Sequence, residues 1–417
     1  MRVQHLIILV ALVLAPIAGA SPAQAGGVVA VCDEAHLRAA LAGGGPVTFA
    51  CSGTITLTAE IVIAADARVD GSGQAVIVSG NGVTRVFKVN PETALALRHL
   101  TVSSGYAFGS TASAGGALYN DHGTVTITDS VLMQNYAYDA GGIYNDHGTV
   151  TVLDSVLSNN DAYSNGGGIY NLDGVVTVIN SSLTHSGAHY AGGGIYNGSG
   201  SLIVDRSTLA DNGVGYGGGG IYNDDGTVIV SASALLENRA DAGGGISNGG
   251  VLTVSNSTFF GNRVGGIDGG GGVYSYGTAT ITNSTLAGNS AGGPNGAGIQ
   301  NDGTMTLANT AVVNNLVGYN CYGAVTDGGG NLSYPDASCP GINVDPLLGP
   351  LQDNGGSTWT MALGLGSPAI DAGDDAICAA DPVNNRDQRG VVRPQGAHCD
   401  SGAFERPGKW LPIILVE

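Results

Sequence analysis

A short glycine-rich motif recurs through the middle of the chain at an almost constant interval. Gly-Gly-Gly-Ile-Tyr-Asn and its close variants end at the following positions: Asn120, Asn145, Asn171, Asn197, Asn223, Asn248, Ser275 and Asn301. Successive motifs are 25–27 residues apart. Self-similarity at such a period is the signature of a stacked structural repeat. The repeat therefore constrains the architecture far more than it constrains the activity.

Each repeat contains three short apolar segments separated by turn residues. Ile-Tyr-Asn is the first, an alternating segment such as the one with Val150 and Val152 is the second, and a segment carrying Leu157 is the third. Alternating β-branched residues bounded by Gly, Asn, Asp and Ser predict strands. No segment of residues 115–318 has room for a connecting helix. Three strands per coil, each paired with its equivalent one coil away, predict an all-β parallel β-helix with coils about 4.8 Å apart.

Equivalent positions of successive coils lie above one another in this fold, so each becomes a column. An inward aliphatic column is predicted for Ile143, Ile169, Ile195, Ile221 and Ile246. The motif asparagines form one polar column, and a second comprises Asn135, Asn160, Asn212, Asn238, Asn262, Asn289 and Asn315. Amide side chains can donate and accept along such a stack. We therefore interpret both asparagine columns as structural.

The paired motifs, Gly-Gly-Gly-Ile-Tyr-Asn and Leu/Phe-x-x-Asn, resemble the GGAI and FxxN repeats of the polymorphic outer-membrane-protein family over residues 115–318. More broadly, the chain resembles the right-handed parallel β-helix, pectin-lyase-like superfamily. Segments 367–373, 386–390 and 399–405 resemble the choice-of-anchor module that ends many secreted bacterial β-helix proteins. The resemblance implies a right-handed coil, a secreted or surface location and often adhesion. It brings no defined catalytic residues.

The N-terminal segment predicts export. Residues 1–25 combine Arg2, an apolar run over 6–18 and a small-x-small site before Gly26, as in a cleaved signal peptide; an uncleaved anchor is the alternative. No segment of the mature chain approaches membrane-spanning length. The apolar segment 410–416 is either a sorting tail or an edge strand, so whether the C-terminus anchors the chain stays open.

Both ends of a β-helix expose an apolar cross-section and need a cap. Residues 26–114 are predicted to hold a capping helix and irregular early coils, with strand candidates at 47–49, 61–63, 75–78 and 85–87. Asp33 can cap the helix, Leu37, Ala40 and Leu41 share one face, and Gly43 ends it. Residues 319–417 have lost the repeat and are predicted to close the other end.

The cysteines agree with an oxidising compartment. All six lie outside the regular repeat, and their even number favours bridges over a metal site, since no pair has zinc-ligand spacing. Sequence proximity predicts the following pairs: Cys32–Cys51, Cys321–Cys339 and Cys378–Cys399. Each loop of about 20 residues would stabilise the fold by roughly 3 kcal/mol if chain entropy dominates.

The charge of the chain restricts its partners. A net charge of −19 with few lysines leaves no electrostatic footprint for nucleic acid. The same charge opposes binding of an acidic polysaccharide unless divalent cations bridge the two. Such cations are a possible cofactor, Ca²⁺ first, because carboxylates recur at the turn after Tyr-Asn. These turn residues are Asp121, Asp146, Asp173, Asp224, Asp225 and Asp302, with His122 and His147 one coil apart.

A polysaccharide lyase or hydrolase needs a unique cluster of catalytic groups. The acidic turn residues recur in most coils, and Asp-Gly and His-Gly corners are common turn chemistry. We therefore assign no catalytic residue. A β-helix lyase or hydrolase remains the alternative function.

Aromatic residues favour binding. One tyrosine follows the inward isoleucine in most coils and is predicted to point outward, with Tyr144, Tyr170, Tyr196 and Tyr222 as the candidate recognition residues for an extracellular glycan or surface protein. A second set lies in the variable loops: Tyr138, Tyr163, Tyr190 and Tyr216. The alternative is that the rings pack on each other and only strengthen the sheet. The sequence thus predicts a secreted or surface-attached β-helix protein for adhesion or binding, with a passive surface protein as a further alternative.

Overall fold

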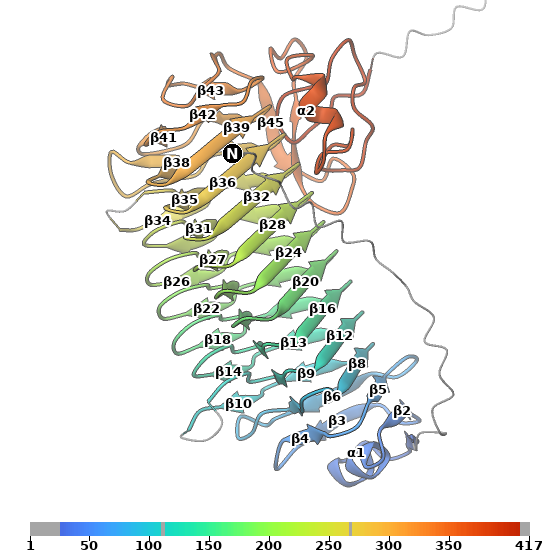
Figure 1. Cartoon of the computed structure of the whole chain (residues 1–417). Helices are drawn as coiled ribbons and strands as arrows, with labels where there is room; N and C mark the ends of the chain where they lie inside the picture. The colour runs from blue at the N-terminus through green and yellow to red at the C-terminus, as the bar shows by residue number, and fades with distance from the viewer. Residues whose placement is uncertain (1–25, 110–112, 267–268, 409–417) are drawn as a thin grey trace, which may run out of the picture.

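The computed structural model describes residues 26–109, 113–266 and 269–408. The chain forms a solenoid of parallel strands whose coils stack along one axis, from the N-terminal helix to a C-terminal module beside the last coils (Figure 1). The predicted all-β parallel fold is confirmed. The predicted signal peptide and the apolar segment 410–416 lie outside the described residues.

Each regular coil passes in turn through three long sheets, which we name C, A and B. Sheet C consists of β4 (Ile61–Ile63), β7 (Phe87–Val89), β11 (Leu118–Asp121), β15 (Ile143–Asp146), β19 (Ile169–Asn171), β23 (Ile195–Asn197), β27 (Ile221–Asn223), β31 (Ile246–Asn248), β35 (Val273–Ser275), β38 (Gly296–Asn301) and β41 (Tyr319–Tyr322).

Sheet A follows sheet C in each coil. It consists of β1 (Gly27–Val29), β2 (Gly45–Phe49), β5 (Ala67–Asp70), β8 (Ala94–Arg98), β12 (Thr124–Thr128), β16 (Thr149–Leu153), β20 (Val175–Ile179), β24 (Ser201–Asp205), β28 (Thr227–Ser231), β32 (Val251–Ser255), β36 (Thr278–Thr282), β39 (Thr304–Ala308) and β42 (Thr326–Asp327).

Sheet B completes the three predicted faces. It consists of β3 (Gly53–Thr56), β6 (Val76–Ser79), β9 (Thr101–Ser103), β13 (Val131–Met133), β17 (Val156–Ser158), β21 (Ser182–Thr184), β25 (Thr208–Ala210), β29 (Ala234–Leu236), β33 (Thr258–Phe260), β37 (Thr285–Ala287), β40 (Ala311–Val313), β43 (Leu332–Tyr334) and β44 (Ile342–Asn343).

A fourth ladder of two-residue strands, sheet D, was not predicted. It follows sheet B and consists of β10 (Tyr106–Ala107), β14 (Tyr136–Ala137), β18 (Asp161–Ala162), β22 (Gly187–Ala188), β26 (Gly213–Val214), β30 (Arg239–Ala240) and β34 (Arg263–Val264). Two residues are too few for hydrophobic periodicity to reveal a strand, so only the backbone pairing defines this sheet.

The core is the column structure that the repeat predicts. Equivalent residues pair in register from coil to coil, as in Ile169 with Ile195 and Tyr170 with Tyr196. The whole inward isoleucine column is fully buried: Ile143, Ile169, Ile195, Ile221 and Ile246. Alternation places the residue after each isoleucine on the outer face of sheet C, and this residue is a tyrosine in the first four coils and Ser247 in the fifth.

Buried polar ladders hold the corners of the coils. Asn145 donates from Nδ2 to Asn171 Oδ1 at 2.8 Å and to the Gly148 carbonyl at 2.9 Å, and the pattern recurs at Asn120, Asn171, Asn197 and Asn223. The second asparagine column does the same, as from Asn238 Nδ2 to Asn262 Oδ1 at 3.0 Å. These amides satisfy one another where the backbone leaves the sheets, so the structural interpretation of both columns is confirmed.

The N-terminal end has the predicted helical cap. Helix α1 (Glu34–Leu41) begins after Asp33, whose carboxylate accepts a hydrogen bond from the His36 amide. Leu37 is fully buried in the core, and the helix ends at Leu41 with Ala42 as its C-cap, directly before the predicted Gly43; Gly44 and Gly45 then have positive φ. The strand predicted over 85–87 begins only at Phe87, because its pairing register matches Phe87 with Ile61 and Leu118.

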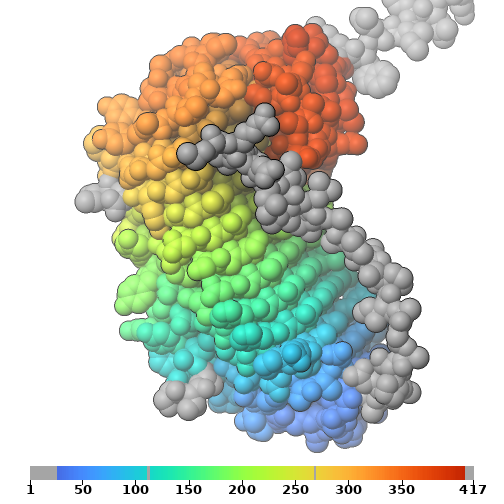
Figure 2. All heavy atoms as spheres, viewed as in Figure 1, coloured from blue at the N-terminus to red at the C-terminus, as the bar shows by residue number. Residues whose placement is uncertain are grey.

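The solenoid sheets continue past residue 318 into β41–β44, beyond the predicted end of the regular repeats. The following residues form a C-terminal module (residues 345–408) with the antiparallel hairpin β45 (Leu348–Gln352) and β46 (Thr360–Leu363) and the short helix α2 (Asp375–Ala379). The module lies along the side of the last coils (Figures 1 and 2). Thr258 of β33 donates to Gln388 Oε1 at 2.6 Å, and the Ala403 amide donates to Thr285 Oγ1 of β37 at 3.0 Å. This module therefore covers the outer face of sheet B at its last strands, β33 and β37 among them.

The structure contains the three predicted disulfides: Cys32–Cys51, Cys321–Cys339 and Cys378–Cys399. The first lies beside helix α1, the second joins β41 to the chain beyond β43, and the third ties α2 to the end of the C-terminal module. All three lie outside residues 115–318, at the N-terminal cap, in the last coil and in the C-terminal module. They indicate an oxidising compartment.

Candidate functional site

The outer face of sheet C carries the predicted tyrosine array, which we name the tyrosine column: Tyr119, Tyr144, Tyr170, Tyr196 and Tyr222. Neighbouring rings stack nearly parallel, with centroids 4.5–5.4 Å apart and interplanar angles of 8–24°. The side chains are half-buried. Neighbouring rings therefore cover part of each other's faces, and only a minor part of each side chain is exposed.

The environment of the tyrosine column keeps its phenols neutral. Burial raises the pKa of Tyr170 to about 12, and nearby carboxylates add to the effect. Burial likewise raises the pKa of Tyr119, whose hydroxyl donates to Asp146 Oδ2 at 2.8 Å. The Tyr196 hydroxyl donates to Asp224 Oδ2 at 3.1 Å. These contacts are what the packing interpretation expects, while recognition by this column stays a prediction.

A second aromatic array lies directly after sheet D, and we name it the aromatic row: Phe108, Tyr138, Tyr163 and His189. Each ring follows the alanine that ends a strand of sheet D, so the four occupy one register in four successive coils. Neighbouring centroids are 5.8, 5.4 and 6.0 Å apart. Phe108 also contacts Tyr163 edge to face at 5.7 Å and stacks on Tyr136 at 5.9 Å, so the rings at this end of the row form a cluster. Tyr106 and Tyr136 stack at 5.8 Å on β10 and β14 themselves.

The aromatic row is much more accessible than the tyrosine column. Phe108, Tyr138 and Tyr163 are 43%, 39% and 48% exposed, and Tyr190 and Tyr216 beside the row are 51% and 61% exposed. The loops that carry these rings are nevertheless ordered by the same ladder as the strands. The Tyr163 amide donates to the Ala137 carbonyl at 3.0 Å, and the Tyr216 amide donates to the Tyr190 carbonyl at 3.0 Å. The row is thus an exposed apolar surface on a hydrogen-bonded support.

Sequence reasoning found only part of the aromatic row. Tyr138 and Tyr163 were assigned to variable loops, and Phe108 and His189 were not recognised as their equivalents. The signal was present as an Ala-aromatic pair in each coil: Ala107-Phe108, Ala137-Tyr138, Ala162-Tyr163 and Ala188-His189. Glycine-rich insertions of different length follow each pair, and they obscured the common register.

The turns between sheets C and A bring together part of the predicted acidic edge, which we name the acid–histidine corner: Asp121, His122, Asp146, His147 and Asp173. The two imidazole rings lie parallel, with centroids 4.9 Å apart and an interplanar angle of 2°. His122 and His147 have positive φ, which directs both side chains outward from equivalent turns. The remaining predicted carboxylates, Asp224, Asp225 and Asp302, lie on later coils and do not join this group.

Hydrogen bonds determine the charge state of the corner. Burial alone would raise the pKa of Asp146, but hydrogen bonds from His147 and Tyr119 outweigh burial and lower it. The hydrogen bond to Asp146 raises the pKa of His147. The corner is therefore a paired, exposed group of imidazoles and carboxylates.

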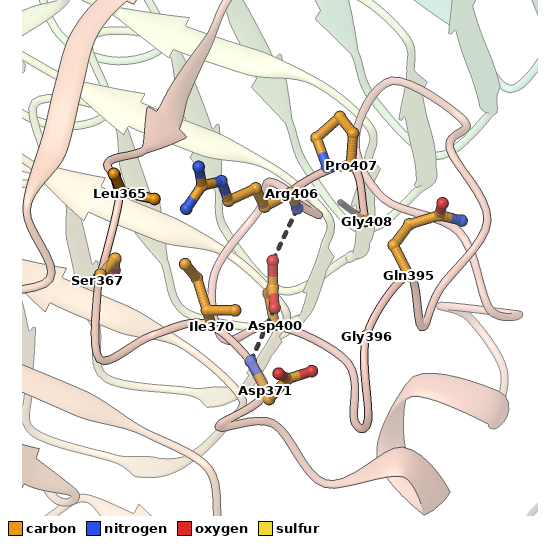
Figure 3. Close-up of a pocket in the computed structure, with 11 residues that line it drawn as sticks. Leu365, Ser367, Ile370, Asp371, Gln395, Gly396, Asp400, Arg406, Pro407 and Gly408 are labelled. Atoms are coloured by element: carbon orange, nitrogen blue, oxygen red, sulfur yellow. Dashed lines mark hydrogen bonds between the residues drawn. The ribbon is translucent and has the colours of Figure 1, made fainter. Parts of the chain in front are cut away.

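The C-terminal module contains a cavity of about 540 Å³ bordered by Ile370, Asp371, Asp400 and Arg406 (Figure 3). Both oxygens of Asp400 are engaged: Oδ1 accepts from the Asp371 amide at 2.8 Å and Oδ2 accepts from the Arg406 amide at 2.7 Å. Burial raises the pKa of Asp400. The carboxylate thus holds two chain segments together, which is a structural role.

The three C-terminal sequence motifs converge in this module. Asp387 pairs with Arg389 at 2.7 Å and accepts the Glu405 amide at 3.0 Å. The fully buried Arg393 donates to the Asp400 carbonyl and lies 3.4 Å from Glu405. Arg389 lies over the Phe404 ring at 3.6 Å. The motif residues thereby build the interior of the module rather than an open site.

A match to a family model agrees with the fold. Residues 115–286 match the family described as "Right handed beta helix region". Among solved structures, the chain is similar to the crystal structure of pectate lyase Pel9A, with 15% sequence identity, a TM-score of 0.49, and coverage of 88% of this chain and 90% of the other. No curated protein matches the chain. The chain therefore contains a right-handed parallel β-helix, and its function has to be argued from its own surfaces.

Helices contribute little to this molecule. No helix within residues 26–109, 113–266 and 269–408 is long and apolar enough to cross a membrane.

Proposed function

We propose that this β-helix protein is secreted or surface-attached and binds an extended, neutral glycan along its aromatic row. One observation carries the proposal. Four successive coils each present a ring in the same register, and the three rings with the largest apolar faces are 39–48% exposed. A linear ligand with a repeated apolar face can contact several such rings at once.

The chemistry of the rings suits a sugar chain. Pyranose rings have an apolar C–H face, and a flat aromatic side chain offers a complementary surface. Aromatic residues also lose little conformational entropy on binding because they have few rotatable bonds. The hydrogen-bonded support of the row reduces this cost further, since the loops are held in place before the ligand arrives.

The charge of the molecule favours a neutral ligand over an acidic one. The chain has a net charge of −19. Asp139 directly follows Tyr138 in the chain, and Asp161 is the first residue of β18, the strand that directly precedes Tyr163. These carboxylates can accept hydrogen bonds from sugar hydroxyls but repel uronates. An acidic polysaccharide is therefore the disfavoured ligand.

The tyrosine column is the second candidate surface for recognition, as the sequence predicts. Its rings are stacked and half-buried, and hydroxyls such as those of Tyr119 and Tyr196 are already hydrogen-bonded, whereas Phe108, Tyr138 and Tyr163 of the aromatic row are 39–48% exposed. We therefore place the stacking contacts at Tyr138 and Tyr163, and treat Tyr170 and Tyr196 as a separate arm of the test.

The test is a glycan array and affinity measurements with the mature chain, residues 26–417. For a neutral polysaccharide that binds, Tyr138→Ala/Tyr163→Ala should weaken affinity at least about tenfold, since each lost stacking contact contributes about 1 kcal/mol. The matched control is Tyr319→Ala/Tyr322→Ala, which removes two tyrosines that are 49% and 48% exposed outside the row. The control should bind like the wild type.

Three results would overturn the proposal. The first is an array on which no neutral glycan binds. The second is equal affinity of wild type and the Tyr138→Ala/Tyr163→Ala variant. The third is a loss of affinity confined to a Tyr170→Phe/Tyr196→Phe variant, which would assign recognition to the hydroxyls of the tyrosine column.

A further inference from the structure

We propose that the C-terminal segment (residues 409–416) binds in the cavity of the C-terminal module, with Trp410 and Leu411 against Leu365 and Ile370. The segment then completes the hydrophobic core of the module instead of serving as a free tail. It lies outside the described residues, so the inference is drawn from the cavity and from the sequence. It does not depend on the glycan proposal, because the aromatic row lies on other coils.

The last described residues lie on the wall of this cavity. Arg406, Pro407 and Gly408 border it in succession (Figure 3). Two hydrogen bonds fix their position: the Arg406 amide donates to Asp400 Oδ2 at 2.7 Å, and Arg406 Nη1 donates to the Gly364 carbonyl at 3.3 Å. The C-terminal segment therefore starts at the cavity, beside the loop that follows β46.

The cavity has an exposed apolar wall. Leu365 is 75% exposed, the largest exposed fraction among the large apolar side chains of the described residues. Ile370, on the same cavity, packs against the core cluster of the module, which contains Leu363 and Phe404. The cavity is therefore an open side of the hydrophobic core of this module. An apolar group bound there would be removed from water together with Leu365, which is favourable.

The C-terminal segment supplies such a group. Residues 410–416 read Trp-Leu-Pro-Ile-Ile-Leu-Val, an apolar run that is too short to span a membrane. The proline at position 412 favours an extended backbone at Leu411. An extended chain advances about 3.3 Å per residue, so Trp410 is at most about 7 Å from Gly408. Trp410 and Leu411 can therefore enter the cavity, and the residues after them can cover Leu365.

The charges at the entrance of the cavity complement the segment. Asp371 borders the cavity and is exposed, and its Oδ1 accepts a hydrogen bond from the His398 amide at 3.0 Å. Lys409 directly follows Gly408 and brings a cation to this border. An exposed ion pair contributes little affinity, but it favours one orientation of the segment, with Lys409 at the entrance and Trp410 inside.

The experiment follows the fluorescence of Trp410 in the mature chain, residues 26–417. Trp359→Phe removes the other tryptophan of the sequence. In this background, acrylamide should quench Trp410 at least about threefold less efficiently in the folded protein than in urea, because a packed ring is shielded from solvent. Leu365→Asp should restore the quenching seen in urea, since it places a charge on the apolar wall. Circular dichroism verifies that this variant is folded.

The matched control is Ile342→Asp, which changes an aliphatic side chain that is 64% exposed outside the cavity and should leave Trp410 shielded. Hydrogen exchange is the second measurement: Trp410→Ser should accelerate exchange in residues 364–371 at least about tenfold, because they lose their cover.

Four results would overturn the proposal. Trp410 is quenched equally in the folded and unfolded protein, or it stays shielded in Leu365→Asp. Exchange in residues 364–371 is unchanged by Trp410→Ser. The shielding disappears on dilution, which would assign the cavity to the segment of a second copy.

Discussion

The tyrosine column and the aromatic row are built from the same kind of side chain at the same interval of one coil, yet they present different surfaces. In the column, each ring lies on a strand of a long sheet and stacks nearly parallel on its neighbours at 4.5–5.4 Å. In the row, each ring follows a two-residue strand, and neighbouring rings are 5.4–6.0 Å apart. Burial raises the pKa values of the column phenols.

The difference shows that spacing alone does not make a recognition surface. Rings on adjacent strands of a parallel sheet lie close enough to stack on each other, so each ring covers part of its neighbour. Rings that follow the strand end are held less tightly side by side, and more of their surface stays in contact with solvent. The exposed fraction of the rings, rather than the number of aromatic residues, distinguishes the two regions.

The largest effect is expected inside the strand that carries Tyr196. Ile195→Asp places a charge in the fully buried isoleucine column and should lower the free energy of unfolding by at least about 4 kcal/mol. The control Ile203→Asp, on the partly exposed face of β24, should cost about 1 kcal/mol or less. Urea denaturation measures both. Similar losses at the two positions would contradict the inward column.

The next effect separates the two aromatic arrays directly. Tyr170→Ala/Tyr196→Ala removes half-buried rings and the stacking contacts around them, so we expect a loss of at least about 3 kcal/mol in stability. Tyr138→Ala/Tyr163→Ala removes more exposed rings and should cost about 1 kcal/mol. Thermal and urea unfolding of the two double variants give the comparison. Equal losses would mean that the row is as structural as the column.

A pH titration probes the same contrast without mutation. The pKa of Tyr170 is about 12 in the folded chain, above its ordinary value of 10.0, because burial disfavours the phenolate. Because folding raises this pKa, the neutral phenol contributes its full stabilisation below pH 10, the pKa of the unfolded tyrosine. The contribution is lost as the pH rises through 12, the pKa in the folded chain. Stability should therefore fall between pH 10 and 12.

Tyrosinate absorbance should show the same transition. In the folded protein the phenols of the column should ionise later than the same residues in urea-unfolded protein. Tyr170→Phe should remove part of the loss of stability at alkaline pH. Coincident absorbance titrations of folded and unfolded protein would contradict the burial of the column.

The smallest expected effect concerns the corner between sheets A and B, where neither array contributes. Equivalent corner residues have positive φ in successive coils, among them Asn180, Ala232 and Asn256. Alanine is strained in this region of the backbone, so Ala232→Gly should raise the free energy of unfolding by about 0.5 kcal/mol. Ala210→Gly, in the extended strand β25, should instead lower it by about 0.5–1 kcal/mol. A loss at both positions would refute the strain argument.

Much of the candidate site could not be predicted, although its residues could be named. His122 and His147 are visible as equivalent turn residues, but only their backbone conformation brings the two rings parallel at 4.9 Å. Phe108 and His189 escaped notice because insertions hide their register. The tyrosine column was predicted to point outward, and it does, but its self-stacking depends on the spacing of the strands.

The repeat determined the solenoid without help from the structure. The pattern has a period of 25–27 residues, with an inward isoleucine and two asparagines in each repeat. It predicts a solenoid in which each residue contacts its equivalent one coil away. The residues of a single repeat are then sufficient to predict the fold, because every column repeats the same contact. The three disulfides could be predicted for a similar reason, since each joins cysteines that are only 18–21 residues apart.

The tertiary structure decided which surfaces stay open. The C-terminal module covers the outer face of the last strands of sheet B through contacts such as Thr258 with Gln388, which are 130 residues apart in the chain. Nothing periodic encodes such contacts, so no pattern predicts them. The exposure of the aromatic row and the burial of the tyrosine column arise in the same way, since accessibility depends on what packs beside a residue and not on its own identity.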